Sequence, residues 1–295
     1  TETLDEVVVV GYGVQKKSDV TGAMARVGEK ELKAMPVRNA LEGMQGKTAG
    51  VDITSSQRPG EVGNINIRGQ RSINAEQGPL YVVDGMVIQN GGIENINPSD
   101  IEAIDILKDA SATAIYGSRG ANGVILVTTK KGKEGKVTLN YSGTVTFETL
   151  HDVTEMMSAA EWLDYARLAK YNAGSYASAT PTYEADKAAF GSVTASWKNI
   201  EKAWVNGVYD PSLVGSYDWA SHGKQTGITH EHTLNASGGS DKFQGYASFG
   251  YLDQKGTQPG QAYERYTLKT SFDVTPANWF KMGSSINASY STQDY

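Results

Sequence analysis

The chain has 295 residues, a net charge of −6 and no cysteine. This acidic balance predicts no nucleic-acid partner and no attraction to an anionic membrane surface. The lack of cysteine excludes a disulfide framework and a thiolate metal site. The mean hydropathy of −0.41 and the absence of a long apolar run exclude a transmembrane helix. A membrane β-barrel is not excluded, because its strands alternate in polarity.

The stretch Ser99–Gly132, SDIEAIDILKDASATAIYGSRGANGVILVTTKKG, predicts two strands joined by a short helical turn. Asp105–Lys108 alternates polar and apolar residues, as a strand does. Ser111 then opens a helical turn that ends at Gly117, a residue suited to the left-handed conformation. After a glycine corner, the β-branched run Val124–Thr129 predicts the second strand. Such a unit closes a small globular domain.

The segment before this unit predicts further short elements. Ala40–Gly46 indicates a short helix ended by glycine, whereas Lys16–Lys33 is polar and mixed. Val51–Thr54 and Ile65–Arg68 alternate as strands. An Asp-Gly pair between two apolar runs then predicts a β-hairpin with a type I′ turn, which spans Leu80–Ile88.

From Lys136 onward the sequence alternates over longer runs, typical of the ~9–11-residue strands of membrane barrels rather than the ~5–6 residues of soluble sheets. Each charged residue in these runs lies on the polar register. A Lys or Arg on the other face at mid-membrane would cost roughly 2–4 kcal/mol. A soluble β-sandwich also has one polar and one apolar face, so the polarity pattern alone does not distinguish the two folds. The length of the strands favours the barrel. The five runs are Val137–Phe147, Ile228–Ala236, Phe243–Tyr251, Tyr266–Val274 and Phe280–Tyr290.

Aromatic residues gather near the ends of these runs, as in the interfacial girdles of membrane barrels. Tight turns are expected at Gly238–Asp241 and Pro276–Asn278, and longer connections at the opposite ends of the strands. The girdle residues are Phe147, Phe243, Tyr251, Tyr266, Trp279, Phe280 and Tyr290.

The longest connection, Leu150–Thr226, predicts a helical insertion. Ser158 and Glu161 form a capping box ahead of a helix that ends at Gly174. Two further helices are expected, and four tryptophans are either anchors for a partner or, as we favour, part of the insertion's own packing. The two helices are Glu184–Phe190 and Ser196–Val205, and the tryptophans are Trp162, Trp197, Trp204 and Trp219.

The motifs KDASATAIYGSRGANGVILVTTKKG, INIRG and PLYVVDG resemble the plug domain of TonB-dependent outer-membrane transporters, in the version of the SusC/RagA branch. The resemblance implies an α+β plug domain followed by the first strands of a large antiparallel transmembrane β-barrel. The expected domains are 1–13, a TonB box and linker; 14–135, the plug; and 136–295, about five barrel strands with the extracellular loop 150–226. Because plugged barrels use about 22 strands, we expect a front portion of a longer polypeptide.

The start of the chain, LDEVVVVGYG, favours an extended strand with free edges. The first residues carry no charged and apolar leader, so any signal peptide is expected to have been removed or never present. A dinucleotide-binding strand is rejected, because the third glycine of that motif is missing. An ordinary first strand is the alternative. The resemblance implies a TonB box, which binds the TonB energy-coupling protein through Leu4, Asp5, Glu6, Val7, Val8, Val9 and Val10.

Two loops, Gln70–Gln77 and Gln89–Glu94, correspond to plug loops that contact the ligand in related transporters. Hydrogen bonds to a sugar or a peptide backbone are therefore expected from Arg71, Gln89, Asn90 and Asn95, with solvated turn residues as the alternative. Arginine's planar fork also suits structural contacts with carboxylates. That role is expected for Arg58, Arg68, Arg71 and Arg119.

No catalytic residues, cofactors or metal sites are predicted. His230 and His232 point to one face of a strand, but no third ligand is evident. The sequence contains no nucleophile elbow, phosphate loop or zinc-protease helix. We therefore expect a protein that is not an enzyme.

The resemblance implies an importer in the outer membrane of a Gram-negative bacterium, with glycans expected ahead of peptides as cargo. Its expected partners are TonB, a SusD-like surface lipoprotein, the oligosaccharide or peptide ligand, and outer-membrane lipid. A dimer of transporter–lipoprotein pairs is an assembly that the resemblance allows. A non-transporting surface receptor or adhesin is the second hypothesis, and a soluble β-rich binding module is the third.

Overall fold

The computed structural model describes residues 7–10, 13–16, 24–32, 37–69, 78–88, 93–109, 113–151 and 155–295. The chain divides into two compact units, Thr1–Thr149 with Thr226–Tyr295, and Leu150–Gln225. None of the helices in these ranges combines the length and the apolar character that crossing a lipid bilayer requires.

The first unit begins with a small α+β domain, here called the N-terminal domain (the described part of residues 24–132). Its central sheet has the order β3-β8-β9-β6-β7, in which only the β6–β9 pair is parallel. A second sheet pairs β4 with β5. The strands are β3 (Met24–Gly28), β4 (Val51–Thr54), β5 (Asn64–Ile67), β6 (Leu80–Val83), β7 (Met86–Val87), β8 (Ile101–Leu107) and β9 (Val124–Thr129). The helices are α1 (Glu29–Leu32), α2 (Ala40–Met44), η2 (Pro98–Asp100) and η3 (Ala114–Asn122).

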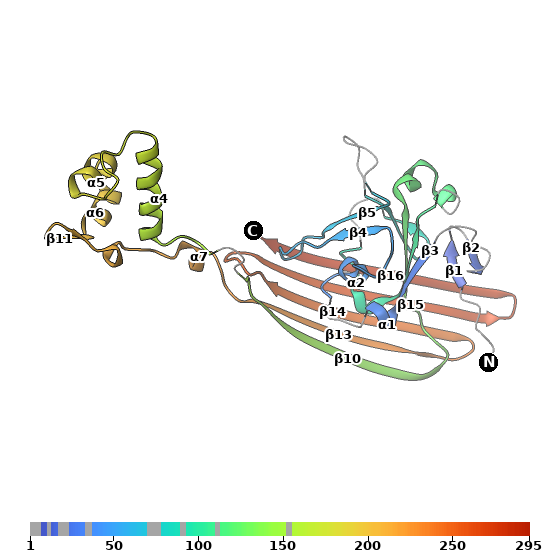
Figure 1. Ribbon diagram of the computed structural model, residues 1–295. Coiled ribbons are helices and arrows are strands. Elements are labelled where there is room, and N and C mark those ends of the chain that lie inside the picture. Colours follow the sequence, from blue (N-terminus) through green and yellow to red (C-terminus); the bar gives the residue numbers. More distant parts are fainter. Residues whose placement is uncertain are drawn as a thin grey trace. The chain divides into compact units, whose positions relative to one another are not determined.

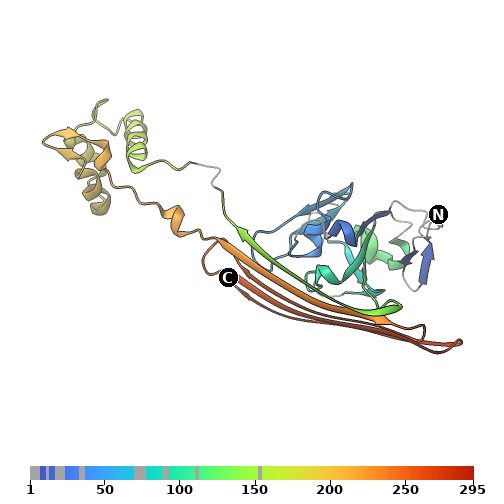
Figure 2. The same ribbon diagram turned by 90° about the horizontal axis from the view of Figure 1, so that it is seen from below.

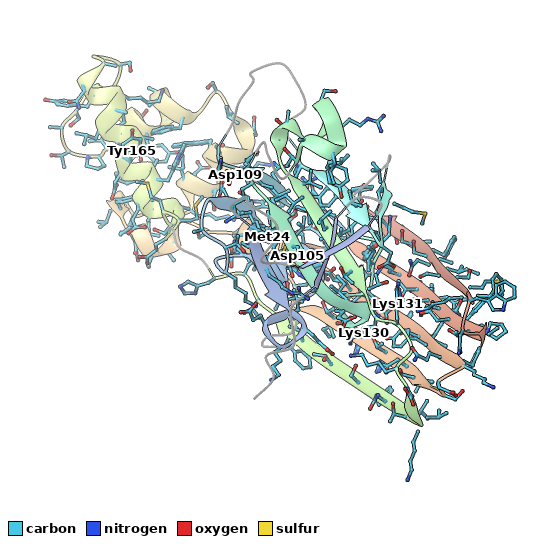
Figure 3. The ribbon with its side chains drawn as sticks, turned by 90° about the vertical axis from the view of Figure 1, so that its right-hand side faces the viewer. Met24, Asp105, Asp109, Lys130, Lys131 and Tyr165 are labelled. Carbon is cyan, nitrogen blue, oxygen red and sulfur yellow. The ribbon has the colours of Figure 1, made fainter. Side chains whose placement is uncertain are left out.

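Strands β8 and β9 form the centre of this domain, because apolar side chains pack on both of their faces. Ile104 and Ile106 lie in one cluster and Leu107 in the other, and all three are fully buried. Asp105, which is labelled in Figure 3, is also buried, and it pairs with Arg26 of the neighbouring strand β3 at 3.9 Å. A buried carboxylate needs such a partner.

Local signals in the sequence place several turns and caps correctly. Asp84 and Gly85 both have positive φ, 49° and 87°, as the predicted type I′ turn requires. Gly117, with φ at 61°, is a non-helical kink within η3, so the predicted helical turn ends there, but a second turn follows as far as Asn122. Asn39 caps α2 by accepting a hydrogen bond from the N–H of Glu42.

The stretch Lys16–Lys33, which looked polar and mixed, contains β3 and α1. Its apolar residues are sparse, but Val27 and Leu32 are buried in the main core. Apolar residues spaced so sparsely give too little periodicity to reveal elements of four or five residues. The predicted cap Ser111 lies outside the described residues, and the residue that precedes η3 is Thr113.

The first unit continues into an open antiparallel sheet of five long strands, here called the long-strand sheet (Figures 1 and 2). The strands have 13 to 16 residues, so each extends beyond its predicted limits. The ends of the strands are rich in polar and small residues, so the alternation of polar and apolar residues did not reveal these extensions. In sheet order the strands are β10 (Gly135–Glu148), β13 (Gly227–Gly239), β14 (Phe243–Lys255), β15 (Ala262–Ala277) and β16 (Phe280–Asp294).

The two faces of the long-strand sheet differ in polarity. The inner face lies against the N-terminal domain (Figure 2) and carries the polar register, for example Ser248, Thr267 and Lys269, which are buried. The outer face exposes large apolar side chains. Among these are Phe249 and Leu268, which pair on adjacent strands and are each 49% exposed. An apolar face turned away from the protein is the arrangement that lipid requires.

A row of aromatic rings crosses the outer face, with Tyr141 and His232 near the middle of β10 and β13. The Tyr141 hydroxyl lies 2.8 Å from Nδ1 of His232. The rings of His232, Tyr251 and Tyr266 follow at centroid separations of 6.5 and 5.0 Å, and Tyr290 pairs with Tyr266 on β16. The row includes three of the predicted girdle residues, and its polar tips suit a water–lipid boundary.

Replacement of Ile286 by arginine is expected to destabilise insertion of the full-length protein by about 2–4 kcal/mol, because Ile286 lies on the outer face and is 56% exposed. Its neighbour Ser285 pairs with the buried Ser271 and therefore points to the inner face. Ser285→Arg is the matched control and should insert normally. Folding yield in lipid vesicles measures both variants, and equal yields for the two would contradict the assignment of the faces.

Turn lengths alternate along the sheet, as expected. Residues 240–242 and 278–279 join strands at one end, here called the turn end. At the other end, the loop end, residues 256–261 join β14 to β15. That connection is shorter than the sequence indicated, because both strands continue past their predicted limits.

The second unit, Leu150–Gln225, has its own core of seven buried residues that include Leu163, Phe190 and Ile200. The predicted capping box of Ser158 and Glu161 is present, and hydrogen bonds from Ser158 lower the pKa of the Glu161 carboxyl. Its elements are α4 (Ala159–Asn172), α5 (Tyr183–Phe190), α6 (Thr194–Glu201), β11 (Trp204–Val205), β12 (Val208–Tyr209), η4 (Pro211–Leu213) and α7 (Trp219–His222).

The helix predicted over Ser196–Val205 is therefore wrong at its end, since the chain turns into β11 at Trp204. Trp204 donates a hydrogen bond from Nε1 to Asp186 at 2.9 Å, and Trp197 packs against the core. Trp162 and Trp219 are 52% and 77% exposed. Two of the four tryptophans thus serve self-packing.

A buried ion pair fixes the helices of this unit. Arg167 binds both carboxylate oxygens of Asp186, a residue with no exposed surface. The Tyr176 hydroxyl donates to the same carboxylate at 2.6 Å, and burial followed by this hydrogen bond raises the Tyr176 pKa to about 12. Because every partner is satisfied, the buried charges are tolerated.

Candidate functional site

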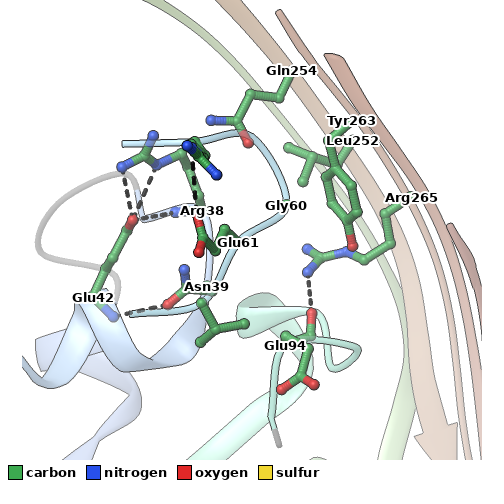
Figure 4. Close-up of a pocket in the computed structure, with 12 residues that line it drawn as sticks. Arg38, Asn39, Glu42, Gly60, Glu61, Glu94, Leu252, Gln254, Tyr263 and Arg265 are labelled. Carbon is green, nitrogen blue, oxygen red and sulfur yellow. Dashed lines mark hydrogen bonds and ion pairs between the residues drawn. The ribbon is translucent and has the colours of Figure 1, made fainter. Parts of the chain in front are cut away.

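Cavities lie at the interface between the N-terminal domain and the inner face of the long-strand sheet. One lies near the loop end and is lined by Arg38, Glu42, Tyr263 and Arg265 among others (Figure 4). Arg38 pairs with Glu42 at 2.8 Å and with Glu148 at 3.5 Å, so it joins α2 to the end of β10. The cavity measures about 20 Å³, enough for one water molecule. It is therefore a packing contact and not a ligand pocket.

A larger cavity of about 440 Å³ lies between the N-terminal domain and the inner faces of β10 and β13. A neighbouring cavity of about 180 Å³ shares Val37, Thr144 and Glu231 with it. Ligand pockets commonly measure ~300–1,000 Å³. Amide, hydroxyl and carboxylate groups line these two cavities, and they can donate and accept hydrogen bonds with a hydroxylated or amide-containing ligand. Their polar lining includes Ser99, Asn140, Ser142, Thr146, Thr229 and Asn235.

Buried hydrogen bonds fasten the N-terminal domain to the inner face. The Asn97 side chain donates from Nδ2 to the hydroxyl of Thr233 at 3.0 Å. The Tyr246 hydroxyl donates to Asp100 at 2.7 Å. Asn97 also accepts from the N–H of Ser99 and so caps η2. The short helix η2 therefore presents two side chains to two different strands of the sheet.

The side chains at this interface form hydrogen bonds and ion pairs between the N-terminal domain and the long-strand sheet. The described residues contain no group of three or more His, Asp or Glu side chains that could hold a metal ion. His232 binds the Tyr141 hydroxyl on the outer face instead. In the N-terminal domain, burial and then the charge of Glu94 raise the pKa of the Tyr81 hydroxyl above its usual range.

The predicted TonB-box residues fall partly outside the description. Leu4, Asp5 and Glu6 lie outside the described residues. Val7–Val10 form strand β1, which pairs antiparallel with β2 (Gly13–Lys16). The described strands leave the other edge of β1 without a partner strand, so the extended conformation expected from the four valines is present.

Of the four predicted ligand residues, the structure describes one, Asn95. Arg71, Gln89 and Asn90 lie outside the described residues. Asn95 is exposed in the turn that precedes Asn97.

Two of the arginines that we assigned structural roles have carboxylate partners within the N-terminal domain. Arg58 pairs with Glu61 at 4.0 Å, and Arg68 pairs with Asp109. Arg119 is exposed.

Sequence reasoning missed the residues that fasten the domain to the sheet, among them Asn97, Asp100, Tyr246, Arg265 and Lys269. Their partners lie more than a hundred residues away. One signal was available: Lys269 lies in the middle of the polar register of its strand, and a buried lysine is unusual unless it is paired.

Residues 16–124 match the family model described as TonB-dependent Receptor Plug Domain. TonB-dependent receptor P39 of Formosa agariphila is 37% identical over 99% of the chain, and TonB-dependent receptor SusC of Bacteroides thetaiotaomicron is 34% identical over 92%. The chain spans about a quarter of the length of these two proteins.

Solved structures show the same similarity. The structure of the RagAB peptide importer in the 'open-open' state superposes with a TM-score of 0.79 at 30% identity. The match covers 98% of this chain and 33% of the other. It therefore includes both the N-terminal domain and the long strands.

Proposed function

The chain belongs to the TonB-dependent receptors of the SusC/RagA type, and we propose from this premise that it forms the plug and first wall strands of an active importer in the outer membrane of a Gram-negative bacterium. The N-terminal domain is the plug, which closes the lumen. The long-strand sheet is the beginning of the wall. In this proposal the protein is a transporter and not an enzyme.

One observation carries the proposal: the long-strand sheet buries its polar face against the N-terminal domain and exposes its apolar face. A soluble protein would bury the apolar face instead. Phe249, Leu268 and Ile286 are each about half exposed on the outer face, whereas Lys269 is buried on the inner face. This inversion suits a wall with lipid outside and a plug inside.

In the proposed mechanism, a pulling force from TonB acts on the plug through the segment that contains strand β1. The TonB energy-coupling protein adds a strand to the segment Leu4–Val10 through backbone hydrogen bonds. Capture of cargo on the outside makes this segment available on the inside. The pull then displaces part of the plug and opens a path along the inner face.

The proposed cargo is an oligomer, with glycans ahead of peptides. The cavities beside β10 and β13 carry hydroxyl and amide groups that hydrogen-bond either sugar hydroxyls or a peptide backbone. A SusD-like surface lipoprotein is the proposed partner at the loop end, and a dimer of such pairs is the proposed assembly. The residues proposed to contact cargo are Arg71, Gln89, Asn90 and Asn95.

Uptake measurements test the import proposal. Cells that carry the full-length protein should accumulate a labelled oligosaccharide, and a labelled peptide of similar mass to a lesser extent. Dissipation of the proton gradient should abolish accumulation and leave surface binding intact. Surface binding without accumulation would instead identify a receptor or adhesin. Preferential accumulation of the peptide would overturn the order of the cargoes.

A further inference from the structure

Strand β15 carries two cationic side chains on its inner face. Arg265 and Lys269 are each 2% exposed, although Lys and Arg are rarely buried without partners. They lie four residues apart on the same register. Both therefore point to the N-terminal domain at different heights along one strand.

Lys269 meets a carboxylate of the N-terminal domain. Its Nζ lies 3.7 Å from an Asp84 oxygen and donates to the hydroxyl of Thr129, with Asn287 of β16 at 3.4 Å. Asp84 in turn accepts from the N–H of Thr129 at 2.9 Å and from its hydroxyl. Strand β9, the β6–β7 turn and the long-strand sheet thus meet at this one ammonium group.

The conformation of Asp84 shows why its charge matters. This residue is left-handed, with φ at 49°, a position that Gly or Asn fills without adding a charge. The turn alone therefore does not call for a carboxylate. Lys269 does, because an ammonium group buried without a counter-charge is strongly destabilising.

Arg265 contacts the N-terminal domain at a second position, Glu94. It donates from its guanidinium to the backbone carbonyl of Glu94. The next contacts with the sheet come from Asn97 and Asp100. A single strand therefore holds the N-terminal domain at Asp84 and again at Glu94.

We propose that Arg265 and Lys269 are positioning residues that fix Asp84 and Glu94 of the plug against the wall and so keep the plug seated. This inference rests on the proposed function, because it names the contacts that must open during import. Loss of either cation removes a buried contact that the neutral hydroxyls around it do not replace. The plug then separates from β15 more often while its own core stays folded.

Cysteine reactivity tests the proposal, since the 295 residues contain no cysteine. The full-length protein, with any further cysteine replaced by serine, receives Ser271→Cys as reporter. Ser271 lies two residues from Lys269, on the inner face, and is 6% exposed. Lys269→Met should raise the rate of its reaction with neutral iodoacetamide by about tenfold or more, which corresponds to ~1.4 kcal/mol. Lys281→Met, on the same register of the exposed strand β16, should leave the rate unchanged.

Two further variants distinguish displacement of the plug from the wall from unfolding of the plug itself. Asp84→Asn keeps the turn and should raise the Ser271→Cys rate as Lys269→Met does, and the double variant should add little to either. A reporter at Ala103→Cys, 1% exposed in β8, should stay unreactive in every variant.

An unchanged rate at the Ser271→Cys reporter would overturn the proposal, as would reaction at both reporters, which means that the domain unfolds. Because the assay needs neither cargo nor energy, its failure leaves the import proposal standing. Absence of uptake with the expected labelling would count against import alone.

Discussion

Deletion of Leu4–Val10 is expected to abolish uptake of the labelled oligosaccharide while insertion into the outer membrane and binding of ligand at the surface stay normal. The deleted segment contains β1, which pairs with β2 in a two-stranded sheet. Among the residues whose burial the structure describes, the two apolar clusters of the N-terminal domain include none from the deleted segment. The loss therefore falls on energy coupling, and accumulation in energised cells measures it.

A matched pair of substitutions sharpens this test. Strand addition uses backbone hydrogen bonds, so Val9→Ile should preserve uptake. Val9→Pro removes an N–H donor and should reduce uptake strongly. Normal uptake after the deletion, or an equal loss with Val9→Ile, would contradict a role of this segment as the coupling strand.

The fold class expected from the sequence is confirmed by the plug-domain match and by the similarity to the RagAB importer. Single residues show which local features the sequence predicted correctly. Asp84 and Gly85 form the predicted turn, Ser158 and Glu161 form the predicted capping box, and the charges Glu231 and Lys269 lie on the inner register. Each of these features depends on neighbours within a few positions, which the sequence displays directly.

Other features depend on residues distant in the chain and were not predicted. Val27 is buried because β3 pairs with β8, about eighty positions away, and Leu32 of α1 packs in the same core. The turn position of Asp84 gave no sign that Lys269 lies opposite. The limits of the domains at residues 13 and 135 and the roles of the ligand residues stay predictions.

Removal of the plug is expected to turn a closed protein into an open pore. The inner face that Ser248, Thr267 and Lys269 present to the N-terminal domain is polar, so it can line water once that domain is absent. Asp100 and Asn97 hydrogen-bond the N-terminal domain to the long-strand sheet, and these contacts do not join one strand of the wall to another. The wall should therefore still fold without residues 14–132.

Conductance across a planar lipid bilayer tests this most directly. The full-length protein should insert and pass almost no current, and the variant that lacks residues 14–132 should insert and pass a large, steady current. A variant that stays soluble without detergent, or that inserts and passes no more current than the full-length protein, would contradict a plug inside a lipid-facing wall.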